Sequence, residues 1–135
     1  MKDTVRILLV DDMPSMRRLV TTFLHELGYL NVREATNGID AFALLHKEAF
    51  DLVVTDWSMP GMTGLELLRA IRKEPDLQHL PVLLITAEAR KENILAAAHS
   101  GASSYMVKPF TMVTLGKKIE GVLQRNQDDS VTAES

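Results

Sequence analysis

The sequence predicts an α/β fold in which helices cover both faces of a five-stranded parallel sheet. Two observations lead to this prediction. Five apolar runs have the length of buried strands, at 5–10, 31–35, 52–55, 82–85 and 105–107. The segments that follow these runs carry apolar residues at helical spacing. Strict alternation of strand and helix is typical of parallel sheets, because each crossover helix packs back onto the sheet.

The helical segments differ in how clearly they are marked. The clearest pattern covers 14–27, where apolar residues recur at i, i+3, i+4 and i+7: Met16, Leu19, Val20, Phe23, Leu24 and Leu27. Pro14 suits the first turn of this helix, and Gly28 is a natural stop. A second helix is predicted at about 38–47, with Ile39, Phe42 and Leu45 turned inward. Three more are expected at about 65–74, 91–100 and 111–125.

The order of the strands follows from the rules for such sheets. Right-handed crossovers leave few arrangements, and the flavodoxin-like order 2-1-3-4-5 is common at this chain length. This order sets the first strand beside the third. It therefore brings Asp11 and Asp12, which follow the first strand, close to Asp56, which follows the third.

The composition fits a single domain and excludes several functions. The chain has 135 residues, of which 46% are hydrophobic, and no apolar run is long enough to cross a bilayer. A net charge of −3 argues against general affinity for nucleic acid or an anionic membrane. There is no cysteine, which excludes disulfides and thiolate metal ligands. We expect one domain at 1–125, a flexible acidic tail at 126–135, a cytoplasmic location and a monomer.

Reactive side chains follow four of the five predicted strands. Asp11 and Asp12 end the first, Asp56 the third, Thr86 the fourth and Lys108 the fifth. Ligands of open parallel sheets bind in the crevice at the carboxyl ends of the strands. Three carboxylates, a hydroxyl and an ammonium are therefore predicted to converge although they are far apart in the sequence.

This set of groups suits a divalent cation and a phosphoryl group. Mg²⁺ prefers oxygen ligands and usually takes carboxylates together with water and phosphate oxygens, a requirement that Asp11, Asp12 and Asp56 meet. Lys108 offsets part of the negative charge and can hold a phosphoryl oxygen. Asp56 is then placed as a nucleophile toward phosphorus, while metal and lysine neutralise the charge of the transition state.

The same residues have structural interpretations when each is taken alone. Asp11 and Asp12 could cap the first helix, where Asp is favoured. Ordinary packing or solvation would account for three others: Thr86, Tyr105 and Lys108. Arg17 and Arg18 form a short basic pair that we expect to be solvated. Asp56 is hardest to explain structurally, because an acid directly after an apolar strand has little structural reason to be there.

Taken together, these positions resemble the receiver domains of two-component response regulators. The matching residues are Asp11, Asp12, Asp56, Thr86, Tyr105 and the run Lys108, Pro109 and Phe110. The resemblance covers about 5–124 and is strongest to the stand-alone chemotaxis members of the family, through the segments 55–62, 86–89 and 91–94. Each motif alone would be weak, whereas agreement at separated positions is a strong signal.

The resemblance implies a role for each site residue. Asp56 would accept the phosphoryl group from a phosphohistidine. One Mg²⁺ would be held by Asp11, Asp12, Asp56 and the backbone carbonyl of Ser58. Catalysis would also use Thr86 and Lys108, the latter through a peptide bond to Pro109 that is cis in the family. Thr86 and Tyr105 would form the switch, and Ser58 and Glu88 would tune the lifetime of the phosphoryl group.

The resemblance also implies partners. The phosphoryl donor would be a histidine kinase of the CheA type. The face that meets other proteins would contain Lys91, Asn93, Tyr105 and Lys118. The flagellar switch protein FliM and a CheZ-type phosphatase are the partners expected there. The protein would act by protein contact, in chemotaxis or flagellar rotation, and would not itself be an enzyme in the usual sense.

Departures from the chemotaxis pattern leave other functions open. Ser58 stands where Asn is familiar and Met13 where Phe is frequent, and the fifth helix contains Gly116 and Gly121. These changes favour, as an alternative, a paralogue that serves as a phosphate sink or another pathway without binding FliM. A haloacid-dehalogenase-type phosphatase is a second alternative, although its Asp-x-Asp pattern is absent after the first strand. A flavin-binding module is disfavoured, because no Ser/Thr-rich phosphate loop follows that strand.

Overall fold

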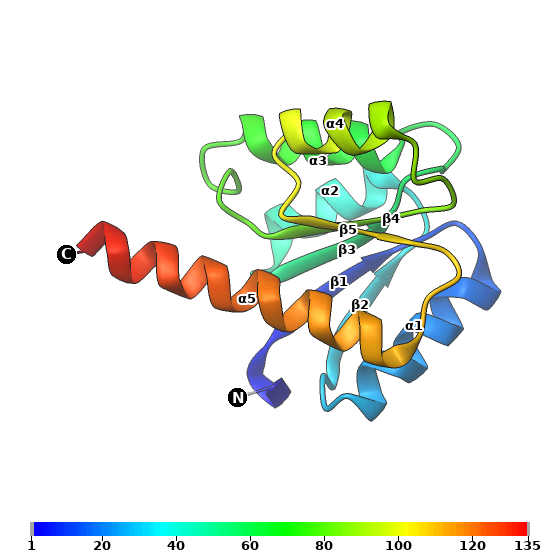
Figure 1. Cartoon of the computed structure of the whole chain (residues 1–135), viewed down its shortest axis with the longest axis horizontal. Coiled ribbons are helices and arrows are strands. Elements are labelled where there is room, and N and C mark those ends of the chain that lie inside the picture. The colour runs from blue at the N-terminus through cyan, green and yellow to red at the C-terminus, as the bar shows by residue number, and fades with distance from the viewer. Residues whose placement is uncertain (1, 135) are drawn as a thin grey trace.

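A computed structural model describes the backbone of residues 2–134 and the side chains of residues 2–125. Five parallel strands form one sheet in the order β2-β1-β3-β4-β5 (Figure 1). The strands are β1 (Arg6–Val10), β2 (Asn31–Ala35), β3 (Leu52–Asp56), β4 (Val82–Thr86) and β5 (Ser104–Val107). The helices are α1 (Pro14–Glu26), α2 (Gly38–Lys47), α3 (Gly64–Lys73), α4 (Lys91–His99) and α5 (Met112–Glu134). The predicted fold class and strand order are confirmed.

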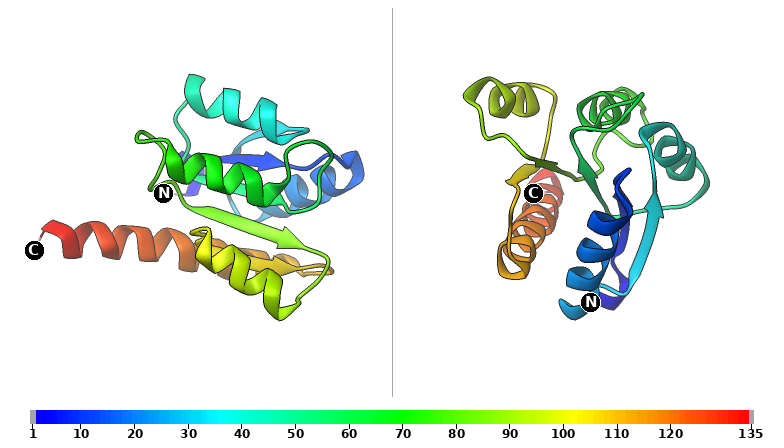
Figure 2. Two further views of the ribbon diagram at one scale, coloured as in Figure 1. Left: turned by 90° about the horizontal axis from the view of Figure 1, so that it is seen from above. Right: turned by 90° about the vertical axis from the view of Figure 1, so that its right-hand side faces the viewer.

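Helices cover both faces of the sheet, and each face has its own apolar core. Helices α1 and α5 lie on one face, and α2, α3 and α4 on the other (Figure 2). Alternate residues of a strand point to opposite faces, so Ile7 and Leu9 enter the first core while Leu8 and Val10 enter the second. Every residue of β3 and β4 is buried, which explains why their sequences are almost continuously apolar.

Two inward positions that the helical pattern predicted are wrong. Ile39 is 65% exposed and Leu19 is 42% exposed. In α2 the buried residues are Gly38, Ala41 and Leu45, and Phe42 packs partly buried against the same core, so the predicted inward position is confirmed for Leu45 and wrong for Ile39. The Met62 side chain packs on Gly38, where an added Cβ would lie 2.8 Å from Met62 Cγ.

The chain departs from the expected boundaries at both ends. A short 3₁₀ helix at Lys2–Thr4 precedes β1. Helix α5 extends to Glu134, beyond the end expected at 125, and projects past the sheet in Figure 1. The division into a domain at 1–125 and a flexible acidic tail at 126–135 stays a prediction, since the side chains of that segment lie outside the described part. None of the helices within residues 2–134 has the length and hydropathy that a membrane crossing demands.

Helix α3 is fixed against the site end of β3 by its own start. Thr63 and Glu66 form a reciprocal capping box, in which each side chain accepts the backbone N–H of the other. The N–H of Gly64 donates to the carbonyl of Trp57 over 2.9 Å. A Cβ at Gly64 would collide with the carbonyl oxygen of Asp56, so this close approach requires glycine.

We predict opposite effects for two glycine substitutions on stability. Gly64→Ala should lower the free energy of unfolding by at least about 1–3 kcal/mol, the usual cost of overpacking. Gly121→Ala should raise it by about 1 kcal/mol, because Gly121 lies within α5 and a Cβ there would meet open space. Urea unfolding of both variants measures the difference. Equal effects would contradict the packing described for Gly64.

Candidate phosphoacceptor site

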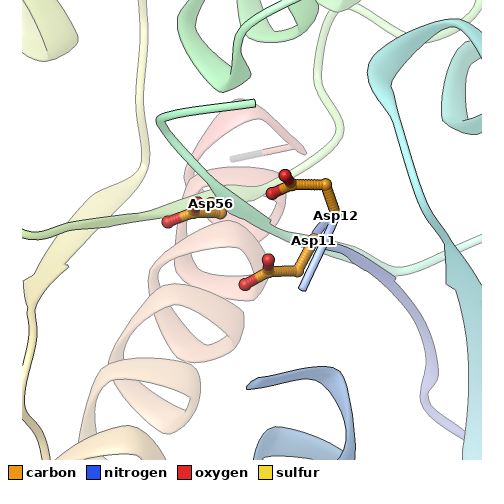
Figure 3. A group of neighbouring side chains, drawn as sticks. All are labelled: Asp11, Asp12 and Asp56. Carbon is orange, nitrogen blue, oxygen red and sulfur yellow. The ribbon is translucent and has the colours of Figure 1, made fainter. Parts of the chain in front are cut away.

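The site lies at the carboxyl edge of the sheet, where β1 and β3 end side by side. Val10 pairs with Thr55, so Asp11 and Asp56, each the next residue, lie close together. Oxygens of the Asp11, Asp12 and Asp56 carboxylates lie within 4.8 Å of one another (Figure 3). Asp11 is 2% exposed and Asp56 is 5% exposed, whereas Asp12 is the most accessible of the three. The cluster predicted from the strand ends is therefore present.

One cation balances part of this negative charge. The ammonium Nζ of Lys108 lies 2.9 Å from Oδ1 of Asp56, and the lysine side chain is only 20% exposed. The Lys108 N–H donates to the carbonyl of Thr86, which holds its backbone at the end of β4. The peptide bond between Lys108 and Pro109 is cis, as expected. An ion pair in such a sheltered position is screened by solvent much less than one on the surface.

Burial sets the electrostatics of Asp11. Loss of solvent raises the pKa of this carboxyl, and the nearby charges of Asp56 and Asp12 raise it further. The N–H of Met13, which donates to Oδ1 over 2.9 Å, and the charge of Lys108 oppose that rise. The net direction is upward, so the surroundings of Asp11 stabilise its ionised form less well than water does. Oxygen ligands of this kind suit a hard divalent cation.

The expected switch and tuning residues surround this cluster. Thr86 is 7% exposed, and its Oγ1 both donates to the carbonyl of Glu88 and accepts the Glu88 N–H, each over 3.1 Å. Ser58 and the side chain of Glu88 are exposed at the rim. Tyr105 is half-buried and lines a narrow gap beneath α4 together with Trp57, Thr86, Ile94 and Ala97.

The residues expected on the partner face lie outside the cluster. Lys91 is exposed at the start of α4, and Asn93, two residues further, is half-buried. Lys118 on α5 reaches over the ring of Tyr105. These residues therefore come from α4, β5 and α5, on the side of the molecule away from β2.

The sequence did not reveal the part played by Arg17. We expected this side chain to be solvated, but it is only 17% exposed. Its Nη1 donates to the carbonyl of Asp11 over 2.8 Å, and its Nε pairs with Glu34 over 3.2 Å. Arg17 therefore ties the backbone of the site to β2. The only signal in the sequence was its place one turn into α1, five residues after Asp12.

Comparison with known proteins identifies the class to which this fold and site belong. Residues 7–120 match the response regulator receiver domain. The chain belongs to this family, whose members are phosphoacceptors, and this favours phosphoacceptance over the phosphatase and flavin alternatives.

Individual relatives are similar over most of the chain. The chemotaxis protein CheY of Pseudomonas aeruginosa is 50% identical over 121 residues, which cover 90% of this chain and 98% of that protein. CheY-3 of Vibrio cholerae is also 50% identical, over 90% of this chain and 93% of its own length. Among solved structures, Vibrio cholerae CheY4 superposes with a TM-score of 0.82 at 36% identity, covering 87% of this chain and 98% of that one.

The raised pKa of Asp11 predicts a pH-dependent stability of the metal-free protein. A folded-state pKa above the ordinary value of 3.8 means that ionisation weakens the fold. The penalty is absent below pH 3.8 and develops as the pH rises through the folded-state pKa. Asp11→Asn should therefore be more stable than the wild type at neutral pH in chelator, with the difference vanishing in acid.

Urea unfolding across this pH range measures the effect. Glu26→Gln is the matched control, because it removes an exposed carboxylate of α1 and should change stability little at any pH. A wild type that is more stable than Asp11→Asn at pH 7 without metal would contradict the electrostatics described here.

Proposed function

We propose that this domain accepts a phosphoryl group on Asp56 from a phosphohistidine of a histidine kinase. The observation that carries the proposal is the buried carboxylate of Asp56, which has two further carboxylates on one side and the Lys108 ammonium at 2.9 Å. This arrangement offers a nucleophile, an oxygen-rich cation site and a fixed positive charge at one point.

The residues present fit one Mg²⁺ per domain. Asp11, Asp12 and Asp56 would supply carboxylate oxygens, and the backbone carbonyl of Ser58 would complete the protein ligands. Burial is the main cause of the raised pKa of Asp11, and the charges of Asp56 and Asp12 add to it; a divalent cation would offset that added charge and favour the ionised carboxylate. When bound, Mg²⁺ neutralises charge on the phosphoryl oxygens during transfer.

The transfer itself is a displacement at phosphorus. A carboxylate oxygen of Asp56 forms the new O–P bond while the N–P bond of the phosphohistidine breaks, and the electron pair returns to the imidazole nitrogen. Lys108 then exchanges its contact with the Asp56 carboxylate for one with a phosphoryl oxygen. Ser58 and Glu88, exposed at the rim, flank the path of the water that later hydrolyses the acyl phosphate.

Phosphorylation would be transmitted through Thr86 and Tyr105. The dianionic group offers Thr86 a charge-assisted hydrogen bond, stronger than its present bonds to the Glu88 backbone. Movement of Thr86 toward Asp56 would open the narrow gap beneath α4 to the Tyr105 ring. The face containing Lys91, Asn93, Tyr105 and Lys118 would then change shape.

Chemotaxis is the process that the relatives favour. Proteins named for chemotaxis are 50% identical over nearly the whole chain. We therefore assign the protein to the cytoplasm, as a monomer, with a CheA-type kinase as donor and with FliM and a CheZ-type phosphatase as partners at the α4–β5–α5 face.

One observation favours a second candidate, a paralogue that does not bind FliM. Gly121 leaves open space within α5, and Gly116 is accommodated under Leu27, so a Cβ at that position would lie 2.9 Å from Leu27 Cδ2. Gly116 is buried beside Leu27, so it is the open space at Gly121 that makes the surface of α5 differ from one built with a larger side chain. Capture of the protein by an immobilised FliM N-terminal peptide, with and without an acyl-phosphate mimic, distinguishes the two candidates.

We predict that Asp56 is the sole phosphoacceptor. Acetyl phosphate with Mg²⁺ should add one acid-stable, base-labile phosphoryl group, which intact-mass spectrometry detects. Asp56→Asn should abolish the addition and leave the fold intact, because the amide is nearly isosteric with the carboxylate. Ser58→Ala, next to the site but with its backbone carbonyl retained, should still be phosphorylated. A phosphoryl group on Asp56→Asn would refute the proposal.

Mg²⁺ binding should be visible in the emission of Trp57, the only tryptophan and the residue that follows Asp56. We expect a saturable change in fluorescence that weakens in acid as the carboxylates take up protons. Asp12→Ala should remove most of the response, whereas Asp40→Ala, a carboxylate on α2 outside the cluster, should titrate as the wild type. An unchanged titration of Asp12→Ala would show that the ion binds elsewhere.

A further inference from the structure

Tyr105 contacts a cation and borders two separate spaces, a groove beside α5 and a narrow gap beneath α4. The ammonium Nζ of Lys118 lies 5.3 Å from the ring centroid. A groove of about 310 Å³ runs between β5 and α5 here, lined by Lys118, Thr114 and Phe110 among others. Tyr105 also lines the gap beneath α4, which has no room for a water molecule. The ring is half-buried between these two spaces.

The ammonium of Lys118 interacts with the face of the Tyr105 ring. Among the side chains of residues 2–125, no carboxylate pairs with its ammonium. The nearby Arg125 is directed elsewhere and donates to the carbonyl of Ser103 over 2.8 Å. Lys118 is half-buried, so its stem lies along the groove while its charge faces the ring. The attraction between an ammonium and the electron-rich face of a phenol ring is therefore not shared with an anion.

We propose that Lys118 is a positioning residue that holds Tyr105 on the groove side and so sets how often the ring enters the gap beneath α4. The inference rests on the proposed function, because the ring must leave Lys118 for the Thr86-linked movement to be completed. The contact favours the resting arrangement, and phosphorylation works against it. Lys118 thus acts on the free domain, before any partner is present.

The size of the effect follows from the strength of such contacts. Cation–π attraction at a partly exposed site corresponds to about a two- to five-fold change in a population ratio. This is small beside the shift needed to turn a switch fully on. It is large enough to change how the populations divide when phosphorylation alone leaves a mixture.

The experiment measures Tyr105 side-chain rotamers by NMR in the full-length protein. The chain has two tyrosines, so tyrosine labelling gives two signals, with buried Tyr29 as an internal reference. Three-bond couplings from the backbone to ring Cγ report the χ1 populations. They are recorded with Mg²⁺, before and after addition of beryllium fluoride as an acyl-phosphate mimic.

Three variants separate the contact from general effects of charge. Lys118→Met keeps the apolar stem and loses the cation, and it should raise the ratio of inward to outward Tyr105 by about two- to five-fold. Lys118→Arg keeps a cation that also stacks on aromatic rings and should restore the wild-type ratio. Lys117→Met removes an equal charge from the exposed neighbouring position, which contacts no ring within the described part, and should change nothing.

The outcomes distinguish this inference from the proposed function. Equal Tyr105 populations in wild type and Lys118→Met, at a mimic concentration that shifts both, would overturn the inference and leave the proposed switch intact. The inference would also fail if Lys118→Arg behaved like Lys118→Met, or if Lys117→Met had the same effect. A mimic that leaves Tyr105 unmoved in the wild type would instead refute the proposed switch.

Discussion

Three carboxylates held together at a sheltered edge of the sheet are the constraint on which the rest of the structure depends. Like charges at this distance repel, and burial adds to the cost of ionising Asp11. They remain together because the pairing of β1 with β3 fixes the backbone from which Asp11 and Asp56 project. Lys108, on the far side of β4, supplies the compensating charge. The apolar core therefore stabilises a site that is electrostatically unfavourable in the absence of a cation.

The two ends of α4 are held very differently, and this matters for any movement on that side. At its C-terminal end, the Arg72 guanidinium donates to the carbonyls of Gly101, Gln78 and Leu80, and Arg69 donates to Ser100. Burial lowers the pKa of Arg72, whose hydrogen bonds are to neutral carbonyls. At its N-terminal end, α4 has no side-chain cap, and it follows the exposed loop after Thr86. Displacement near Thr86 thus breaks fewer interactions than displacement at the far end.

The sequence predicted the elements and the acidic cluster, because both follow from patterns that the chain carries locally. A polar residue directly after a buried strand marks the carboxyl edge of the sheet. Because the strands are parallel, all such residues lie at the same edge. The sequence could not predict contacts between side chains that belong to different helices and strands. Ile39 was misplaced because the buried residues beside it, Gly38 and Ala41, are too small to stand out in an apolar pattern. Arg17 was predicted to be solvated because nothing in its own segment points to the Asp11 carbonyl. The contact of Lys118 with Tyr105 also joins two elements, α5 and β5, and was not predicted for that reason.

Thr86 links the charge at the site to the loop that leads into α4. Its hydroxyl is at present both donor and acceptor to the backbone of Glu88, so it cannot turn toward a phosphoryl group without releasing that turn. One charge-assisted hydrogen bond contributes about 1.5–3 kcal/mol, whereas a nearly complete change of population requires about 5.5 kcal/mol. Thr86 alone is therefore insufficient. In the proposed switch, the remainder would come from Lys108 at the phosphoryl group and from a partner that binds the altered face. A switch of the proposed kind would stay near balance until its partner is present, and in that range a contact as weak as the one between Lys118 and Tyr105 would alter the response.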